Sequence, residues 1–166
     1  PIWSPTGSRV AFESDRDGHW QVYVFDRDSG AVTNVSRGRE ADVNPAWALD
    51  DSRIAFQSSR NGNWDIYVVN PDGSDLIQLT SSWTDEVVPT WTCDSQEVIY
   101  QGMTREGNRD IYIVRVNNPK LAHRLTDHRA FDGIPVLCQA ENDGRRGFAL
   151  HGGAAFGSVM MPLEIR

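Results

Sequence analysis

Residues 45–80 read PAWALDDSRIAFQSSRNGNWDIYVVNPDGSDLIQLT, and this stretch is repeated in altered form on both sides of itself. Residues 1–36 read PIWSPTGSRVAFESDRDGHWQVYVFDRDSGAVTNVS, and residues 89–126 read PTWTCDSQEVIYQGMTREGNRDIYIVRVNNPKLAHRLT. Each unit starts with a proline, and the three prolines are 44 residues apart. Because a period of roughly 40–45 residues is typical of β-propeller blades, the spacing predicts a propeller.

Each unit has the pattern expected of four short β-strands. Runs rich in Val, Ile, Phe, Tyr and Trp alternate with turn residues such as Asp, Asn, Gly and Pro. In the central unit the strands are expected at Asn44–Ala48, Arg53–Ser58, Trp64–Val69 and Asp75–Leu79. Since no stretch shows the period and caps of a helix, we expect an all-β fold of four-stranded antiparallel blades.

The repeat predicts three full blades and part of a fourth. The blades are expected at approximately 1–40, 41–84 and 85–130, with a partial blade at 131–166 that restarts at Pro135 but lacks the tryptophan. Such a segment would leave a six- or seven-bladed propeller incomplete. We therefore expect either that the sequence is part of a longer protein or that it associates with another copy to complete the ring.

The charge of the chain disfavours two classes of partner. With 16 basic and 23 acidic residues the net charge is −7, and the pI is 5.0. Nucleic acids and anionic membrane surfaces bind proteins through clustered Lys and Arg, so we expect neither of them as a partner. No apolar run is long enough to span a bilayer, so direct membrane insertion is not expected. The first residue already belongs to a repeat, and no leader peptide is visible.

Three tryptophans recur at the same place in successive units. Trp3, Trp47 and Trp91 are 44 residues apart and lie on the presumed inner strand of each blade. A large flat side chain there would fill the gap between adjacent sheets. We expect core packing for these residues rather than a platform for a ligand.

The recurring phrases Pro-x-Trp-Ser-Pro-x-Gly, Ile-Ala-Phe-x-Ser, Ile-Tyr-Val and Leu-Thr resemble the TolB-type propeller repeat. The residues that carry the resemblance are Pro1, Trp3, Ser4, Pro5 and Gly7 in the first unit, Pro45, Trp47, Ile54, Ala55, Phe56, Ser58, Ile66, Tyr67, Gly73, Leu79 and Thr80 in the second, and Pro89, Trp91, Ile111, Tyr112, Leu125 and Thr126 in the third. The resemblance is to the repeat rather than to TolB itself. It implies a bacterial propeller of the periplasm or extracellular space that binds other proteins.

Propellers of this repeat type also precede the hydrolase domain of prolyl-oligopeptidase-like enzymes. The tripeptide His151-Gly152-Gly153 resembles an oxyanion loop of that hydrolase fold. Yet His151 aligns with Gln57 at the end of a strand, and the sequence contains no Gly-x-Ser-x-Gly motif. We therefore expect no catalytic residue in this chain, and no enzyme activity.

An acidic residue stands three positions before the strand-opening proline of each later unit. These residues are Asp42, Glu86 and Asp132, and a propeller would bring them to one face near the mouth of the central channel. One interpretation is a negatively charged rim that takes a cation or a basic segment of a partner. The other is that each carboxylate accepts hydrogen bonds from the backbone of the connection between blades. No spacing indicates a dedicated metal loop, and no cofactor is expected.

Basic residues near the second turn of each unit are further candidates for partner contacts. His19, Arg60 and Arg105 lie in or beside these turns, and arginine is enriched at binding hot spots.

The two cysteines, Cys93 and Cys138, fall at almost the same place in successive units. Two interpretations stay open: buried free thiols, or a disulfide between neighbouring inner strands, which a location outside the cytoplasm would permit.

From these patterns we expect a non-catalytic protein–protein interaction module of the bacterial envelope or extracellular space, binding through one propeller face or the channel mouth. Two alternatives stay open. One is an accessory propeller of a prolyl-oligopeptidase-like hydrolase whose catalytic domain is absent from this sequence, and the other is a structural subunit of a larger envelope assembly.

Overall fold

The computed structural model describes residues 1–127, 132–133, 139–140 and 146–147. The strands are β1 (Ile2–Trp3), β2 (Arg9–Ser14), β3 (Gln21–Asp26), β4 (Val32–Asn34), β5 (Asp42–Trp47), β6 (Ile54–Ser58), β7 (Asp65–Val69), β8 (Ile77–Gln78), β9 (Glu86–Trp91), β10 (Glu97–Met103), β11 (Arg109–Arg115), β12 (Asn118–Arg124), β13 (Gln139–Ala140) and β14 (Arg146–Gly147). No helix occurs in the part of the chain that the structure describes.

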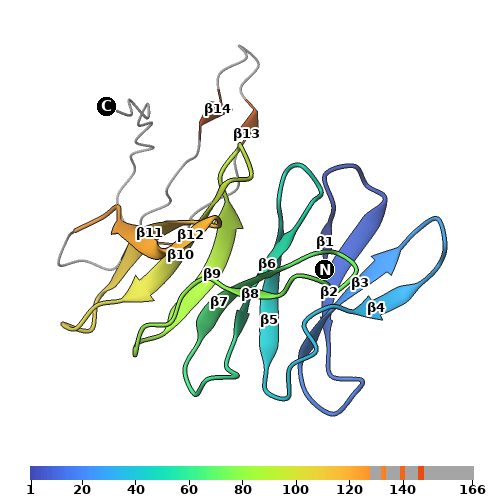
Figure 1. The fold of residues 1–166 in the computed structure, drawn as a ribbon, viewed down its shortest axis with the longest axis horizontal. Helices are drawn as coiled ribbons and strands as arrows, with labels where there is room; N and C mark the ends of the chain where they lie inside the picture. Colours follow the sequence, from blue (N-terminus) through green and yellow to red (C-terminus); the bar gives the residue numbers. More distant parts are fainter. Residues whose placement is uncertain (128–131, 134–138, 141–145, 148–166) are drawn as a thin grey trace.

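The first twelve strands form three antiparallel meanders, each with its strands paired in chain order. We call β1–β4 blade 1, β5–β8 blade 2 and β9–β12 blade 3. Figure 1 shows them side by side, from blue through green to orange. The predicted all-β propeller segment of four-stranded blades is thus confirmed. The predicted limits between blades stay predictions, and most of the fourth unit lies outside the described residues; there, β13 pairs with β14.

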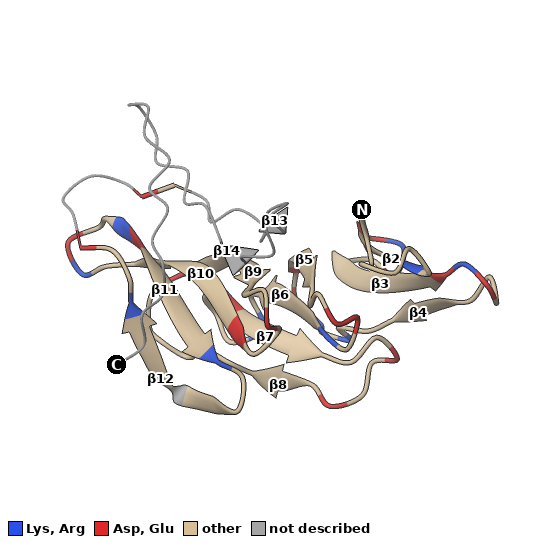
Figure 2. Cartoon of the chain, turned by 90° about the horizontal axis from the view of Figure 1, so that it is seen from above, with Lys and Arg blue, Asp and Glu red and all other residues tan. Residues whose placement is uncertain are grey.

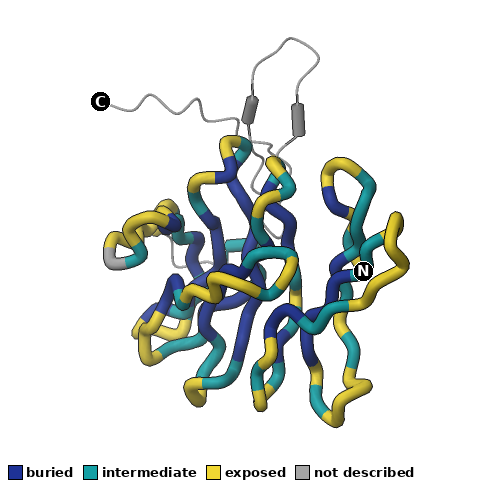
Figure 3. Tube along the Cα trace, turned by 45° about the vertical axis from the view of Figure 1, so that its right-hand side comes forward, coloured by how far each residue is buried: buried dark blue, intermediate teal, exposed yellow. Residues whose placement is uncertain are grey.

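Apolar side chains of adjacent blades form the core. Strands β6 and β7 are buried along their whole length, because blade 2 is covered on both faces. Alternate residues of a strand point to opposite faces: Phe56 and Tyr67 pack toward blade 1, whereas Ala55 and Ile66 pack toward blade 3. Figure 3 shows this buried centre and the exposed turns around it.

Two of the recurring tryptophans join one blade to the next. The indole Nε1 of Trp47 donates to the carbonyl of Ile2 at 3.2 Å, and that of Trp91 donates to the carbonyl of Ala46 at 3.0 Å. Both rings are buried, which confirms the expected core packing. Trp3 is instead 58% exposed, because no described sheet covers the outer face of blade 1.

The turns and connections divide between two ends of the blades. One end, which we call the connector face, carries the β2–β3, β6–β7 and β10–β11 turns together with the β4–β5 and β8–β9 connections. The three turns hold Gly18, Gly62 and Gly107 at equivalent positions, with φ of 96°, 97° and 83°. Glycine suits this left-handed conformation because it has no Cβ. Figure 2 shows many of the charged residues in the loops between strands, at both ends of the blades, and at strand ends.

The backbone of the inner strands is bent at one recurring position. Asn44 and Val88, each just before the proline of its unit, both have φ of 55°. Their backbone amides donate to side chains of the preceding blade, Asn44 to Glu13 Oε1 at 2.6 Å and Val88 to Gln57 Oε1 at 3.0 Å. The register of β5 on β6 and of β9 on β10 shifts beside these residues.

The outer strand of blade 2 is shorter than predicted. We expected Asp75–Leu79, but β8 covers only Ile77–Gln78. Asp75 has φ of 52° and its carboxylate accepts a hydrogen bond from Asn70. It therefore belongs to the turn rather than to the strand.

Candidate functional site

The connections between blades are held by the backbone of the three predicted acidic residues. The amides of Asp42, Glu86 and Asp132 donate to the carbonyls of Trp20, Trp64 and Arg109, at 2.8, 2.7 and 3.1 Å. These acceptors occupy equivalent positions in successive units. Asp42 and Glu86 therefore start the inner strands β5 and β9 at the connector face, and all three acidic residues are tied to the blade before them.

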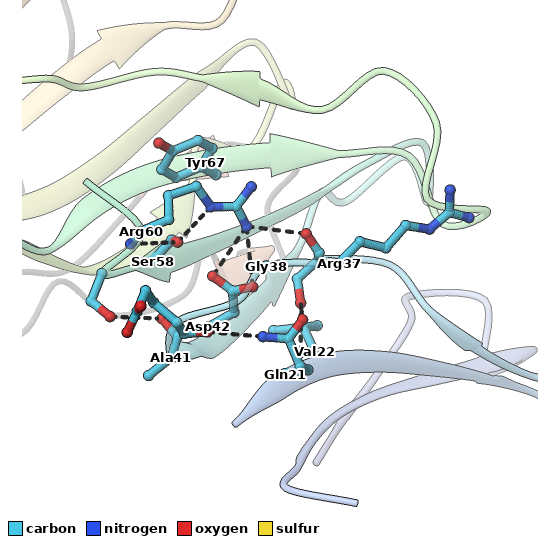
Figure 4. Close-up of polar contacts among 12 residues, drawn as sticks. Gln21, Val22, Arg37, Gly38, Ala41, Asp42, Ser58, Arg60 and Tyr67 are labelled. Atoms are coloured by element: carbon cyan, nitrogen blue, oxygen red, sulfur yellow. Dashed lines mark hydrogen bonds and ion pairs between the residues drawn. The ribbon is translucent and has the colours of Figure 1, made fainter. Parts of the chain in front are cut away.

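The Asp42 side chain forms a buried ion pair with Arg60 at the joint between blades 1 and 2. Asp42 is fully buried, and Arg60 Nη2 lies 3.1 Å from both of its carboxylate oxygens. The same nitrogen donates to the Ser36 carbonyl at 3.1 Å, while Nε donates to Ser58 Oγ at 2.8 Å. The guanidinium also lies over the Tyr67 ring, 4.5 Å from its centre. Figure 4 shows it between that ring and the carboxylate.

Gly38 completes this joint beneath the ion pair. A Cβ on Gly38 would lie 2.5 Å from Asp42 Oδ2 and 3.2 Å from Arg60 Nη2, so only glycine leaves room for the pair. The Gly38 carbonyl lies 2.9 Å from Nε2 of His19. The structure thus brings three of the predicted partner-binding residues, His19, Asp42 and Arg60, to one joint.

Blade 1 contains the same arrangement without a carboxylate. Arg16 Nε donates to Ser14 Oγ at 3.0 Å, and the guanidinium lies 4.6 Å from the centre of the Tyr23 ring. Arg16 was not among the predicted site residues. A comparison of the units would have found it, since Ser14-x-Arg16 and Ser58-x-Arg60 occupy the same place.

Blade 3 departs from this pattern. Gly102 and Thr104 stand where blade 2 has Ser58 and Arg60, so the β10–β11 turn carries no arginine at that position. The Tyr112 ring instead approaches the backbone, and a Cβ on Gly102 would lie 2.9 Å from it. Tyr112 stacks on Tyr100 with ring centres 5.6 Å apart.

Glu86 is consequently a buried acid at the joint between blades 2 and 3. It is 6% exposed, and its Oε2 has no hydrogen-bond partner among the described residues. Burial raises the pKa of Glu86, and the charge of Asp65 raises it further, while hydroxyl groups of Thr80 and Ser82 act in the opposite direction. Burial also raises the pKa of Asp65. Two acidic side chains thus share this joint.

A cleft of about 270 Å³ opens on the connector face of blade 3. Its lining includes Trp83 and Thr84 from the β8–β9 connection and Thr104 and Tyr112 from blade 3. Trp83 is 70% exposed. The predicted residue Arg105 also lines this cleft, apart from the joint that holds His19, Asp42 and Arg60.

The remaining predicted residues are placed as follows. Asp132 accepts a hydrogen bond at its carbonyl from Gln101 Nε2 at 3.0 Å, and its Oδ2 is buried without a partner among the described residues. Cys93 lies just after β9 and is half-buried, whereas Cys138 lies outside the described residues. The disulfide therefore stays a prediction, as do the partner-binding roles.

The described part of the chain lacks two further kinds of feature. There, no group of three or more His, Cys, Asp or Glu side chains is arranged to hold a metal ion. Nor does this part contain a helix of the length and apolarity needed to cross a membrane.

The repeated blades and their joints have a counterpart among known families. The model of the TolB beta propeller domain matches residues 1–145. The chain belongs to this family. The TolB-type resemblance predicted from the repeat is thereby confirmed. No curated protein matches the chain.

Solved structures similar to this TolB-type propeller include two TolB proteins. Putative TolB from Agrobacterium tumefaciens is 24% identical with a TM-score of 0.66, over 75% of this chain and 47% of that one. TolB from Acinetobacter baumannii is 22% identical with a TM-score of 0.67, over 95% of this chain and 38% of that one. A prolyl endopeptidase is 16% identical with a TM-score of 0.60, over 90% of this chain and 24% of that one. The TolB-type chain described here therefore spans less than half of each of these proteins, and the likeness concerns the fold.

Proposed function

We propose that this TolB-type propeller is a non-catalytic protein-binding module and that it binds its partner through the connector face. The observation that carries the proposal is the exposure of two tryptophans there. Trp83, in the β8–β9 connection, is 70% exposed, and Trp20, in the β2–β3 turn, is 49% exposed. Tryptophan is enriched at binding hot spots.

The connector face also has a rigid base for such binding. The backbone joints at Asp42 and Glu86 and the buried pair of Asp42 with Arg60 hold the connections in place. A preorganised surface loses less conformational entropy when a partner binds. Asp42 and Arg60 serve here as support beneath the surface, whereas Trp83 and Arg105 are accessible to a partner.

We infer a location in the periplasm or outside the cell of a bacterium. Membership of the TolB propeller family supports this location, and the net charge of −7 agrees with a protein rather than a nucleic acid as partner. The accessory-hydrolase alternative has the likeness to a prolyl endopeptidase, which concerns the fold alone, and the structural-subunit alternative has no observation of its own in its favour. Self-association to complete a ring stays a prediction that light scattering would check.

Photo-cross-linking tests the proposal. A photoreactive amino acid replaces Trp83 on the connector face or, as the matched control, Asp28 in the exposed β3–β4 turn at the opposite end of the blades. In bacterial cells that express the protein, we expect a discrete cross-linked protein from position 83 and none from position 28. Equal capture at both positions, or capture at position 28 alone, would rule out the connector face.

A further inference from the structure

The three blades differ at one position of the connector face, which is an arginine in blades 1 and 2 but not in blade 3. In blade 3 a buried carboxylic acid therefore has no arginine from this position to pair with. In blades 1 and 2 an arginine of the connector face lies on a tyrosine ring, Arg16 on Tyr23 and Arg60 on Tyr67. In blade 3 the equivalent residue is Thr104. The position of Arg60 therefore holds no arginine in blade 3, although Arg105, the next residue of the turn, lines the same cleft as Tyr112.

The acid that such an arginine would meet is present. Glu86 faces Gly102 in the strand register as Asp42 faces Ser58. Asp42 is neutralised by Arg60, whereas Glu86 Oε2 is buried and unpartnered among the described residues. Burial raises the pKa of Tyr100 and of Tyr112, and the charge of Glu86 adds to both shifts, so the acid lies close to the stacked tyrosines.

A cleft opens beside Tyr112; Arg105 and Glu106 are among its lining residues, and Glu86 is not. The cleft of about 270 Å³ is lined by Tyr112, Thr104 and Met103 and is bordered by the exposed Trp83. Arg124 also lines the cleft, but it forms ion pairs with Asp110 and Asp127. Arg124 stands opposite Tyr112 as Gln78 stands opposite Tyr67, so it occupies the place of Gln78 and not that of Arg60.

We propose that this cleft receives an arginine side chain of the protein partner, which takes in blade 3 the place that Arg60 takes in blade 2. We expect its guanidinium to lie on Tyr112 and to reach Glu86, which is buried and does not itself line the cleft. A planar guanidinium suits this site better than an ammonium group, because it stacks on aromatic rings and donates several hydrogen bonds in one plane. The inference rests on the proposed function and specifies the chemistry of the partner.

The test is an NMR titration of the isotope-labelled protein with N-acetyl-arginine N-methylamide. The matched neutral compound is the citrulline analogue, which has nearly the same shape. We expect saturable shifts of the Gly102, Thr104 and Tyr112 amides with the arginine compound, and at least tenfold weaker binding of the citrulline and lysine analogues. No saturable shift at these amides, or an equal response to citrulline, would overturn the proposal.

Variants make the result specific to the cleft. Thr104→Arg supplies the missing guanidinium within the chain and should weaken binding of the probe at least tenfold. Ala31→Arg adds the same charge at an exposed position of the β3–β4 turn, at the opposite end of the blades, and should leave binding unchanged. Glu86→Gln removes the acid and should also weaken binding tenfold, so the test does not depend on one variant. Unchanged binding in both Thr104→Arg and Glu86→Gln would contradict the proposal.

The cross-linking experiment separates this inference from the proposed function. If wild type and Thr104→Arg capture a partner equally from position 83, partner binding through the connector face stands and arginine insertion fails. If the wild type captures none, the proposed function fails, and the titration still decides whether the cleft accepts a guanidinium.

Discussion

The indole Nε1 of Trp91 donates a hydrogen bond of 3.0 Å to the carbonyl of Ala46, which lies 45 residues earlier in the chain. Replacing Trp91 by Phe removes the donor from a buried joint and leaves a small cavity. We expect the free energy of unfolding to fall by about 2 kcal/mol, measured by urea denaturation. Trp3→Phe is the matched control: Trp3 is mostly exposed, and its loss should cost less than about 0.5 kcal/mol. Equal losses in the two variants would contradict the role of the joint.

Arg60 and Arg16 allow a second paired comparison. Arg60→Met leaves the fully buried Asp42 carboxylate without its cation, and breaking a buried ion pair in this way costs about 3 kcal/mol of stability. Arg16→Met loses a ring contact at an exposed position, worth about 1 kcal/mol or less. Thermal and urea unfolding of both variants would measure the difference. If the two arginines proved equivalent, the ion pair would contribute nothing beyond stacking.

Val88 has a left-handed backbone conformation, which is unfavourable for a β-branched residue. Asn44 has the same φ at the equivalent position, and asparagine tolerates this region. Val88→Asn should therefore raise the free energy of unfolding by about 1 kcal/mol. The reverse change, Asn44→Val, should lower it by a similar amount. Loss of stability in Val88→Asn would show that the valine side chain contributes more by packing than its backbone costs.

The buried acids at the second joint predict a pH dependence. Burial raises the pKa of Glu86 above its ordinary 4.5 and that of Asp65 above 3.8. Between the ordinary and the raised pKa of each group, the folded protein therefore keeps a proton that the unfolded chain has released. The contribution of these groups to stability is complete at pH values below their ordinary pKa values. It is lost as pH rises through their raised pKa values in the folded protein. Glu86→Gln should be more stable than wild type near neutral pH, and its free energy of unfolding should change less with pH above pH 4.5.

A control with the opposite sign is available at Asp26. Hydrogen bonds from Ser29 lower the pKa of Asp26 to about 2, so its contribution is present above pH 3.8 and is lost as pH falls toward 2. Asp26→Asn should change the profile only in that acidic window. A Glu86→Gln profile parallel to wild type above pH 4.5 would refute the assignment of the slope to Glu86.

The repeat in the sequence was sufficient for the fold. Tryptophans and prolines spaced by 44 residues mark each inner strand, and the alternating apolar runs mark the strands that follow. Short-range patterns missed some strand ends: β5 covers Asp42–Trp47 rather than the expected Asn44–Ala48. Asp75, likewise, belongs to the β7–β8 turn.

The site was harder to predict, because equivalent positions have different surroundings. Asp42 and Glu86 look alike in the repeat, yet one is paired with Arg60 and the other has no partner at its Oε2 among the described residues. The difference depends on Thr104, which is distant from Glu86 in sequence. Aligning the units shows the substitution, but burial and the cleft emerge only from the packing of blade 3 on blade 2.

The indoles of Trp47 and Trp91 have main-chain acceptors, and this has an evolutionary consequence. Every residue carries a carbonyl, so the bonds to Ile2 and Ala46 make no demand on the side chain of the neighbouring unit. As far as these two bonds are concerned, a unit could be duplicated, deleted or exchanged with another without a change in the sequence on either side. Gene rearrangement could thus change the number of units in such a protein while point mutations adapt the loops.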